Sequence, residues 1–296
     1  MQSKNRKSFR RAFDTTVRSA GDDRLSTEVF LSENGVPLIL WIEYSFSKRQ
    51  VIHAYREIPK DAGVEGSRLI KEDLPELYGM QVQARFVKKA HEAIKHRDSA
   101  ESLLDAFVDS ARMLAQVGMF SLEQLSEIDF TDPMAWRRLD LSAWPELADG
   151  CLAYSKELEP RIEAEGIMPD LRIDLYAASE GQVFRFRRDT IIECQLTDED
   201  HTLSAYLSDD VHELVVRMTV SSKDQKVKAI HSQCLRAPYL VFCQLPFPRV
   251  SELVGLSLDA DFKKKLKEAV GGRQGCIHLT DLIIELIRYY HRALSK

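Results

Sequence analysis

The run Gly271-Gly272-Arg273-Gln274-Gly275-Cys276-Ile277-His278 holds the residue types best suited to chemistry in this chain of 296 residues. Apolar residues follow it at helical spacing, so we expect Cys276 and His278 to lie at the start of a helix. The free backbone amides at a helix start carry partial positive charge, which lowers the pKa of a nearby thiol. Gly271, Gly272 and Gly275 allow backbone conformations that would turn such amides toward a bound ligand or cofactor. We therefore expect Cys276 to have a lowered pKa and thiolate character.

This segment has three interpretations. In the first, Cys276 and His278 bind zinc or an iron–sulfur species together with a distant cysteine, either Cys243 or Cys234. In the second, Cys276 is a catalytic or redox thiol, with His278 as its base or Cys243 as its redox partner. In the third, the glycines only form a turn between two helices, Cys276 is a small buried apolar residue and His278 caps a helix.

The same pattern occurs earlier in the chain without this chemistry. Glu76-Leu77-Tyr78-Gly79 matches Glu252-Leu253-Val254-Gly255, an offset of 252 − 76 = 176, and Phe86 matches Phe262 at the same offset. Where the later copy has residues 271–278, the earlier one has 95–102, with Ala100 and Ser102 in place of Cys276 and His278. The repeat predicts two homologous modules, of which the first is a degenerate copy that lacks the site.

Each copy opens with strand signals and closes with helical ones. Leu38–Ile42 and Val51-Ile52 flank a polar turn, as do Leu214–Val220 and Val227–Ile230, which predicts antiparallel strands. Residues 171–175 alternate in the same way and predict one more strand before residue 183. One face of the last helix is apolar through Leu279, Leu282, Ile283, Leu286, Ile287 and Tyr290. We predict an α+β fold in which an antiparallel sheet is followed by packed helices in each of two tandem modules.

A helical connector is expected between the modules. Residues 118–168 belong to neither copy, and Pro145 suits the first turn of a helix whose apolar stripe is Leu147, Cys151, Leu158 and Ile162, before Gly166 ends it. The expected domains are therefore a first module at 1–117, the connector at 118–168 and a second module with the Cys/His site at 169–296.

Composition excludes several classes of function. A formal net charge of −5 argues against nucleic-acid binding, which requires a basic surface. No apolar run reaches the roughly 18 residues of a membrane span. Five cysteines, an odd number at irregular spacing, indicate reduced thiols and a cytoplasmic location rather than a disulfide framework. The common nucleotide-binding and hydrolase motifs are absent as well.

The later copy resembles a known family. Arg236-Ala237-Pro238-Tyr239-Leu240-Val241-Phe242-Cys243, followed by Gly271-Gly272 and Gly275-Cys276-Ile277-His278-Leu279, is similar to the bacterial domain of unknown function 2889 family (DUF2889). The resemblance implies a bacterial protein and supports the fold and the site residues, but it brings no reaction. A cysteine after a strand and a Cys/His pair at the last helix are also similar in layout to iron–sulfur scaffold proteins.

We therefore expect a protein that binds a metal or another ligand, with zinc or an iron–sulfur species as the cofactor, in a scaffold or sensor role. The sequence leaves open whether the protein is an enzyme: the alternatives are a thiol-dependent enzyme with Cys276 as nucleophile, and a non-catalytic interaction module. The partner is a small ligand or a protein of unknown identity.

Overall fold

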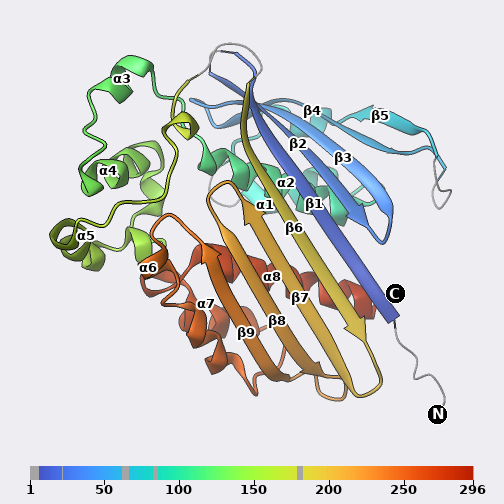
Figure 1. Cartoon of the computed structure of the whole chain (residues 1–296). Coiled ribbons are helices and arrows are strands. Elements are labelled where there is room, and N and C mark those ends of the chain that lie inside the picture. Colours follow the sequence, from blue (N-terminus) through green and yellow to red (C-terminus); the bar gives the residue numbers. More distant parts are fainter. Residues whose placement is uncertain (1–6, 22, 62–66, 83–85, 179–182, 296) are drawn as a thin grey trace. The chain divides into compact units, whose positions relative to one another are not determined.

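The computed structural model describes residues 7–21, 23–61, 67–82, 86–178 and 183–295 (Figure 1). The chain divides into two compact units. Unit 1 comprises Met1–Arg10, Ile128–Leu171 and Thr190–Lys296, and unit 2 comprises Arg11–Glu127 and Arg172–Asp189. The residues expected to form most of the connector thus belong to the same unit as the Cys/His segment.

Unit 2 is built on an antiparallel sheet. Its strands lie in the order β5-β4-β3-β2-β1 and are β1 (Lys7–Ser19, which begins in unit 1), β2 (Arg24–Glu33), β3 (Val36–Ser45), β4 (Gln50–Pro59) and β5 (Leu69–Asp73). Alternate residues of β3 are buried, as a sheet with one covered face requires: Leu38, Leu40, Ile42 and Tyr44. The buried side chains define a single covered face.

Helices of unit 2 pack on that face (Figure 1). They are α1 (Phe86–Ile94) and α2 (Ala100–Met113). The unit also contains the short α3 (Leu122–Ser126), which Ser121 caps. Leu103, Ala106 and Phe107 of α2 are fully buried in one core with Val29 and Leu40 of the sheet. The order of strands and helices predicted for the first half is confirmed.

Unit 1 also contains antiparallel strands. Its strands follow the order β6-β7-β8-β9 and are β6 (Phe184–Leu196, whose first residues belong to unit 2), β7 (Asp200–Asp209), β8 (Glu213–Ser221) and β9 (Val227–Arg236). The helices after them are α6 (Leu240–Cys243), α7 (Phe262–Val270) and α8 (Ile277–Leu294). All six residues of the apolar face predicted for the last helix are buried in α8. The α+β class, with antiparallel strands followed by helices, is therefore confirmed.

Residues 128–171 are helical but fragmented. They contain α4 (Pro133–Ala143), α5 (Glu159–Glu165) and three single turns of 3₁₀ helix, one of which begins at Pro145. The buried guanidinium of Arg137 donates to the carbonyls of Ala153 and Ser155 and so fixes the path between α4 and α5. Gly166 ends α5 in the left-handed conformation, as expected. The continuous helix implied by the apolar stripe does not form.

One expected strand is also wrong. Ile173–Leu175 is a turn of 3₁₀ helix rather than the first strand of a hairpin. In this turn Leu175 is buried and Ile173 is exposed, whereas a strand would place both side chains on the same face. The residues expected to form the hairpin turn, 179–181, lie outside the described residues. Among the described helices, none is both long enough and apolar enough to cross a membrane.

Candidate functional site

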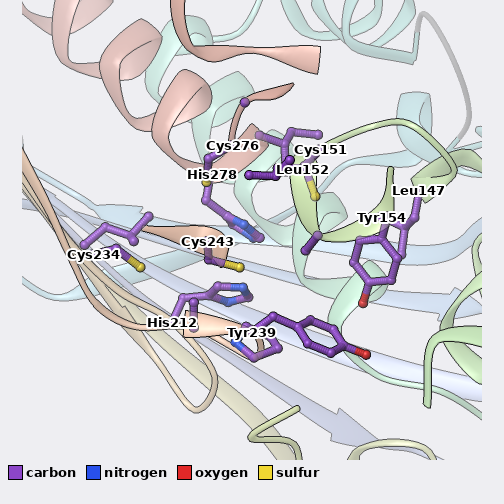
Figure 2. Close-up of a pocket in the computed structure, with 16 residues that line it drawn as sticks. Leu147, Cys151, Leu152, Tyr154, His212, Cys234, Tyr239, Cys243, Cys276 and His278 are labelled. Atoms are coloured by element: carbon purple, nitrogen blue, oxygen red, sulfur yellow. The ribbon is translucent and has the colours of Figure 1, made fainter. Parts of the chain in front are cut away.

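Unit 1 contains a small cavity to which four of the five cysteines contribute. The cavity has a volume of about 60 Å³, and its walls come from the segment between α4 and α5, the β7–β8 turn, the end of β9 with α6, and the start of α8 (Figure 2). The cysteines and histidines that line it are Cys151, Cys234, Cys243, Cys276, His212 and His278. We refer to it as the Cys/His cavity. The fifth cysteine, Cys194, lies in the apolar core of unit 1 and does not line it.

The candidate metal ligands predicted from the sequence all reach this cavity. Cys234 comes from β9, Cys243 ends α6, and Cys276 and His278 lie at the start of α8. Cys276 is the N-cap residue, and its Sγ accepts a hydrogen bond from the backbone amide of Leu279 at 3.4 Å. Residues more than 40 positions apart in the sequence are thus brought together, while their role in metal binding stays a prediction.

The glycines of the site have different positions. Gly275 lines the cavity, and a Cβ atom there would lie 2.0 Å from the carbonyl oxygen of Val270, so only glycine fits. Gly271 and Gly272 do not line the cavity and form the turn that follows α7; Gly272 has a φ of +63°. In this structure Gly271 and Gly272 shape the turn, and Gly275 alone of the three faces a possible ligand.

His212 was not expected from the sequence. It lies in the turn between β7 and β8, and its ring contacts that of His278, with 3.9 Å between the centroids and a tilt of 35° between the ring planes. The buried carboxylate of Asp209 accepts from the backbone amides of Val211 and His212 and lies 3.2 Å from Nδ1 of His212. A carboxylate at one ring nitrogen fixes the orientation of the imidazole and leaves the other nitrogen for a ligand, as in many metal sites.

Cys151 was expected only as part of an apolar stripe. It precedes a 3₁₀ turn at Leu152–Tyr154, and the amide of Leu152 donates to the carbonyl of Gly275 at 2.8 Å. This bond joins the segment between α4 and α5 to the turn before α8. The same segment packs through Ala153, Leu158 and Ile162 against Tyr239 and Phe242. Cys151 therefore reaches the cavity through tertiary packing, for which its sequence spacing gives no signal.

Burial overrides the expected activation of Cys276. It raises the pKa of the Cys276 thiol to about 12, although the amides of Leu279 and His278 act in the opposite direction. Burial likewise raises the pKa of Cys234 to about 11. The pKa of Cys243 is raised first by burial and then by the negative charge that Cys276 and Cys151 would carry if ionised. The expectation of a lowered pKa at Cys276 is wrong, because the loss of water around the thiol outweighs the hydrogen bonds from these amides.

Two tyrosines occupy the side of the cavity away from Cys234 (Figure 2). The Tyr154 hydroxyl donates to the carboxylate of Asp140. The Tyr239 hydroxyl is buried and has no hydrogen-bond partner among the described residues. Burial, followed by the negative charge of Asp140, raises the pKa of Tyr239, so this phenol is a neutral donor. The cavity thus has a sulfur and imidazole side and a phenol side.

Comparison with known proteins finds a family that matches part of the chain, but it indicates no activity. Residues 170–291 match the model of a family described as "Protein of unknown function (DUF2889)", which confirms the predicted resemblance. No curated protein and no solved structure gives a significant match. The matched segment contains every cavity residue from His212 to His278, whereas Cys151 and Tyr154 lie outside it.

Proposed function

We propose that unit 1 binds zinc or an iron–sulfur species in the Cys/His cavity, in a scaffold or sensor role. The observation that carries the proposal is the gathering of four cysteines and two histidines around one cavity of about 60 Å³. Thiolate and imidazole are the ligands that zinc prefers, and thiolates hold iron–sulfur clusters. Pockets for organic ligands occupy roughly 300–1,000 Å³, so this volume suits an ion or a small inorganic group better.

The protonation of the thiols supports metal binding over thiol catalysis. Raised pKa values leave the Cys276 and Cys243 thiols neutral near pH 7, and a neutral thiol is a poor nucleophile. A bound cation removes the protons from its thiol ligands and offsets the repulsion between neighbouring thiolates. The same burial that disfavours a catalytic Cys276 is therefore compatible with a metal ligand in a reducing compartment such as the cytoplasm.

Binding requires a local adjustment of the side chains. Within the described ranges, no three His, Cys, Asp or Glu side chains already stand in positions that would hold a metal ion. The proposed ligands are Cys243, Cys276 and His278, with Cys234 as the alternative distant thiol and His212 as a further donor held by Asp209. Rotation of the thiols toward one centre would complete the set, since every one of them lines the same cavity.

The test is elemental analysis of protein purified without oxygen. We expect about one zinc per chain, or iron and inorganic sulfide together, in the wild type, and loss of that content in Cys276→Ala and Cys243→Ala. Cys194→Ala is the matched control, because it removes a buried thiol outside the cavity. Absence of metal in the wild type, with no change in melting temperature on addition of zinc, would reject the proposal.

We also infer that the two halves descend from one module. The helices α1 (86–94) and α7 (262–270) have identical bounds at an offset of 176, and so do β2 (24–33) and β7 (200–209). Local hydrogen bonds repeat as well: the amide of Gly79 donates to Val51, and that of Gly255 to Val227. These correspondences support a duplication in which only the later copy acquired cysteines.

A further inference from the structure

Cys151 lines the Cys/His cavity beside the proposed ligands, and its position resembles that of Cys276. Each of these cysteines directly precedes a helical turn: Cys151 is the N-cap residue of the 3₁₀ turn Leu152–Tyr154, and Cys276 is the N-cap residue of α8. The amide of Leu152 donates to the carbonyl of Gly275 at 2.8 Å, so the residues next to the two cysteines are hydrogen-bonded to each other. The two cysteines therefore line the cavity from adjacent turns (Figure 2).

Resting on the proposed metal site, we infer that its metal is zinc and that Cys151 is one of its ligands. The complete set is then Cys151, Cys243, Cys276 and His278. Three thiolates and one imidazole are a ligand set of structural zinc sites, which are tetrahedral and closed. Iron–sulfur clusters are usually held by four thiolates. A closed zinc site of this kind holds segments of the chain together and leaves no position for a substrate.

Cys151 interacts more strongly with the other thiols than Cys234 does. Burial is the main cause of the raised pKa of Cys276, and the charge of an ionised Cys151 contributes more to it than that of Cys234. The pKa of Cys243, also raised mainly by burial, responds more to Cys151 than to Cys234 as well. Because repulsion between charges grows as they approach, this order indicates that Cys151 is the nearer thiol. The Cys234 thiol instead donates a hydrogen bond to the carbonyl of Arg236 at 3.6 Å.

Cys151 and Cys243 are also held by the same packing. Both lie against one apolar cluster, which consists of Ala153, Leu158, Ile162, Tyr239 and Phe242. Figure 2 shows Cys151 and Cys234 on opposite sides of the His278 ring. The two candidate thiols would therefore approach an ion at His278 from different directions, and the packing favours Cys151 as the partner of Cys243.

The surroundings of Cys151 suit a thiolate once an ion is bound. Burial raises the pKa of Cys151, while the amides of Tyr154 and Ala153 and the positive charge of Arg137 lower it and the negative charge of Asp140 raises it. The Arg137 side chain is buried and donates to the carbonyl of Ala153, which fixes the turn after Cys151. A bound cation offsets the cost of burying the thiolate, and these amides then support it.

Zinc at this position would control how one segment is attached. Cys151 lies between α4 and α5, whereas the other three ligands lie in α6 and at the start of α8. In the metal-free protein the segment is attached by apolar packing and by the hydrogen bond from Leu152 to Gly275. A bond from zinc to Cys151 adds a link that depends on the metal. Residues 149–155 are therefore the element that responds to zinc in a sensor role.

A matched pair of variants tests the choice of thiol. Cys151→Ser and Cys234→Ser each remove one sulfur that lines the cavity. In competition with a chromophoric chelator, Cys151→Ser should weaken zinc binding at least about 100-fold and Cys234→Ser less than about threefold, since loss of a ligand costs at least as much as loss of a supporting group. Equal effects, or a larger effect of Cys234→Ser, would overturn the role of Cys151. Circular dichroism in the presence of a chelator shows whether each variant is folded.

Two measurements on the wild type need no variant to fold. X-ray absorption at the zinc edge should show about three sulfur atoms at about 2.3 Å and one nitrogen atom at about 2.0–2.1 Å. Fewer than three sulfur atoms would overturn the ligand set. Zinc should also slow backbone hydrogen exchange in residues 149–155, and unchanged exchange there in the zinc-bound protein would show that this segment does not respond.

Metal content separates failure of this ligand set from failure of the proposed function. A wild type without metal rejects the proposed function and, with it, the role of Cys151. A wild type with iron and sulfide supports the proposed function but rejects zinc. A wild type with zinc, together with a folded Cys151→Ser that binds zinc with unchanged affinity, rejects only the role of Cys151.

Discussion

At the scale of single residues, burial decides the chemistry of the cysteines. A helix start favours a thiolate by hydrogen bonds and partial charge, but desolvation of the Cys276 thiol has the larger effect and raises its pKa to about 12. The metal-free protein should therefore hold Cys276 as an inert thiol. The rate at which the Cys276 thiol reacts with an alkylating reagent therefore distinguishes a metal ligand from a catalytic thiol.

We predict that Cys276 of the metal-free protein reacts with iodoacetamide at pH 8 about a thousandfold more slowly than an ordinary thiol. The reason is the thiolate fraction, which is set by a pKa of about 12 rather than the usual value of about 8.5. Mass spectrometry of the Cys276 peptide measures the rate, with the urea-unfolded protein as the reference. A native rate equal to the unfolded one would contradict the raised pKa, and only a native rate faster than the unfolded one would favour the alternative of a catalytic thiol.

The sequence revealed only part of this residue set. Cys234, Cys243, Cys276 and His278 could be chosen because thiols and imidazoles are recognisable ligands and two of them share a glycine-rich turn. Cys151 and His212 reach the cavity through contacts that local spacing does not encode: a hydrogen bond from Leu152 to Gly275, and a turn fixed by Asp209. The effect of burial on the Cys276 pKa likewise depends on tertiary neighbours.

At the scale of elements, periodic segments were predictable and turns were not. The apolar face of α8 follows from helical spacing alone, because each apolar residue recurs on the side that packs on the sheet. At 171–175, alternation over five residues was too short to distinguish a strand from a 3₁₀ turn. The apolar stripe after Pro145 was shared among short helical turns rather than one helix.

The turn before α8 gives an element-scale prediction. Gly275→Ala should destabilise the protein by about 2–3 kcal/mol, because the new Cβ would lie 2.0 Å from the Val270 carbonyl oxygen and force the turn to move. Gly272→Ala is the control: its Cβ would meet open space, and only the φ of +63° opposes it, at about 1 kcal/mol.

Urea denaturation of both variants measures the difference. Cys276 lies next to Gly275, so Gly275→Ala should also reduce the metal content of the purified protein, whereas Gly272→Ala should not. Equal losses of stability in the two variants would show that the close approach to Val270 does not constrain the turn.

At the scale of the whole molecule, the proposed duplication pairs two halves of the chain that differ in their chemistry. The offset of 176 pairs Cys234, Cys243 and Cys276 with Ile58, Ser67 and Ala100, so the first half could share the fold but has no thiol at these positions. A ligand that binds only the native state stabilises the part of the molecule that it contacts. Any stabilisation by metal should therefore be uneven along the chain.

We predict that zinc slows backbone hydrogen exchange in the cavity segments 147–154, 234–243 and 275–279 and leaves the segments 58–61 and 99–103, which lie 176 positions earlier than parts of the last two, unchanged. The reason is that local opening of the first set must release the metal, while opening of the second releases nothing. Mass-spectrometric exchange with and without zinc measures the protection, and Cys276→Ala should abolish it. Equal protection of both sets of segments would contradict a metal site confined to the later copy.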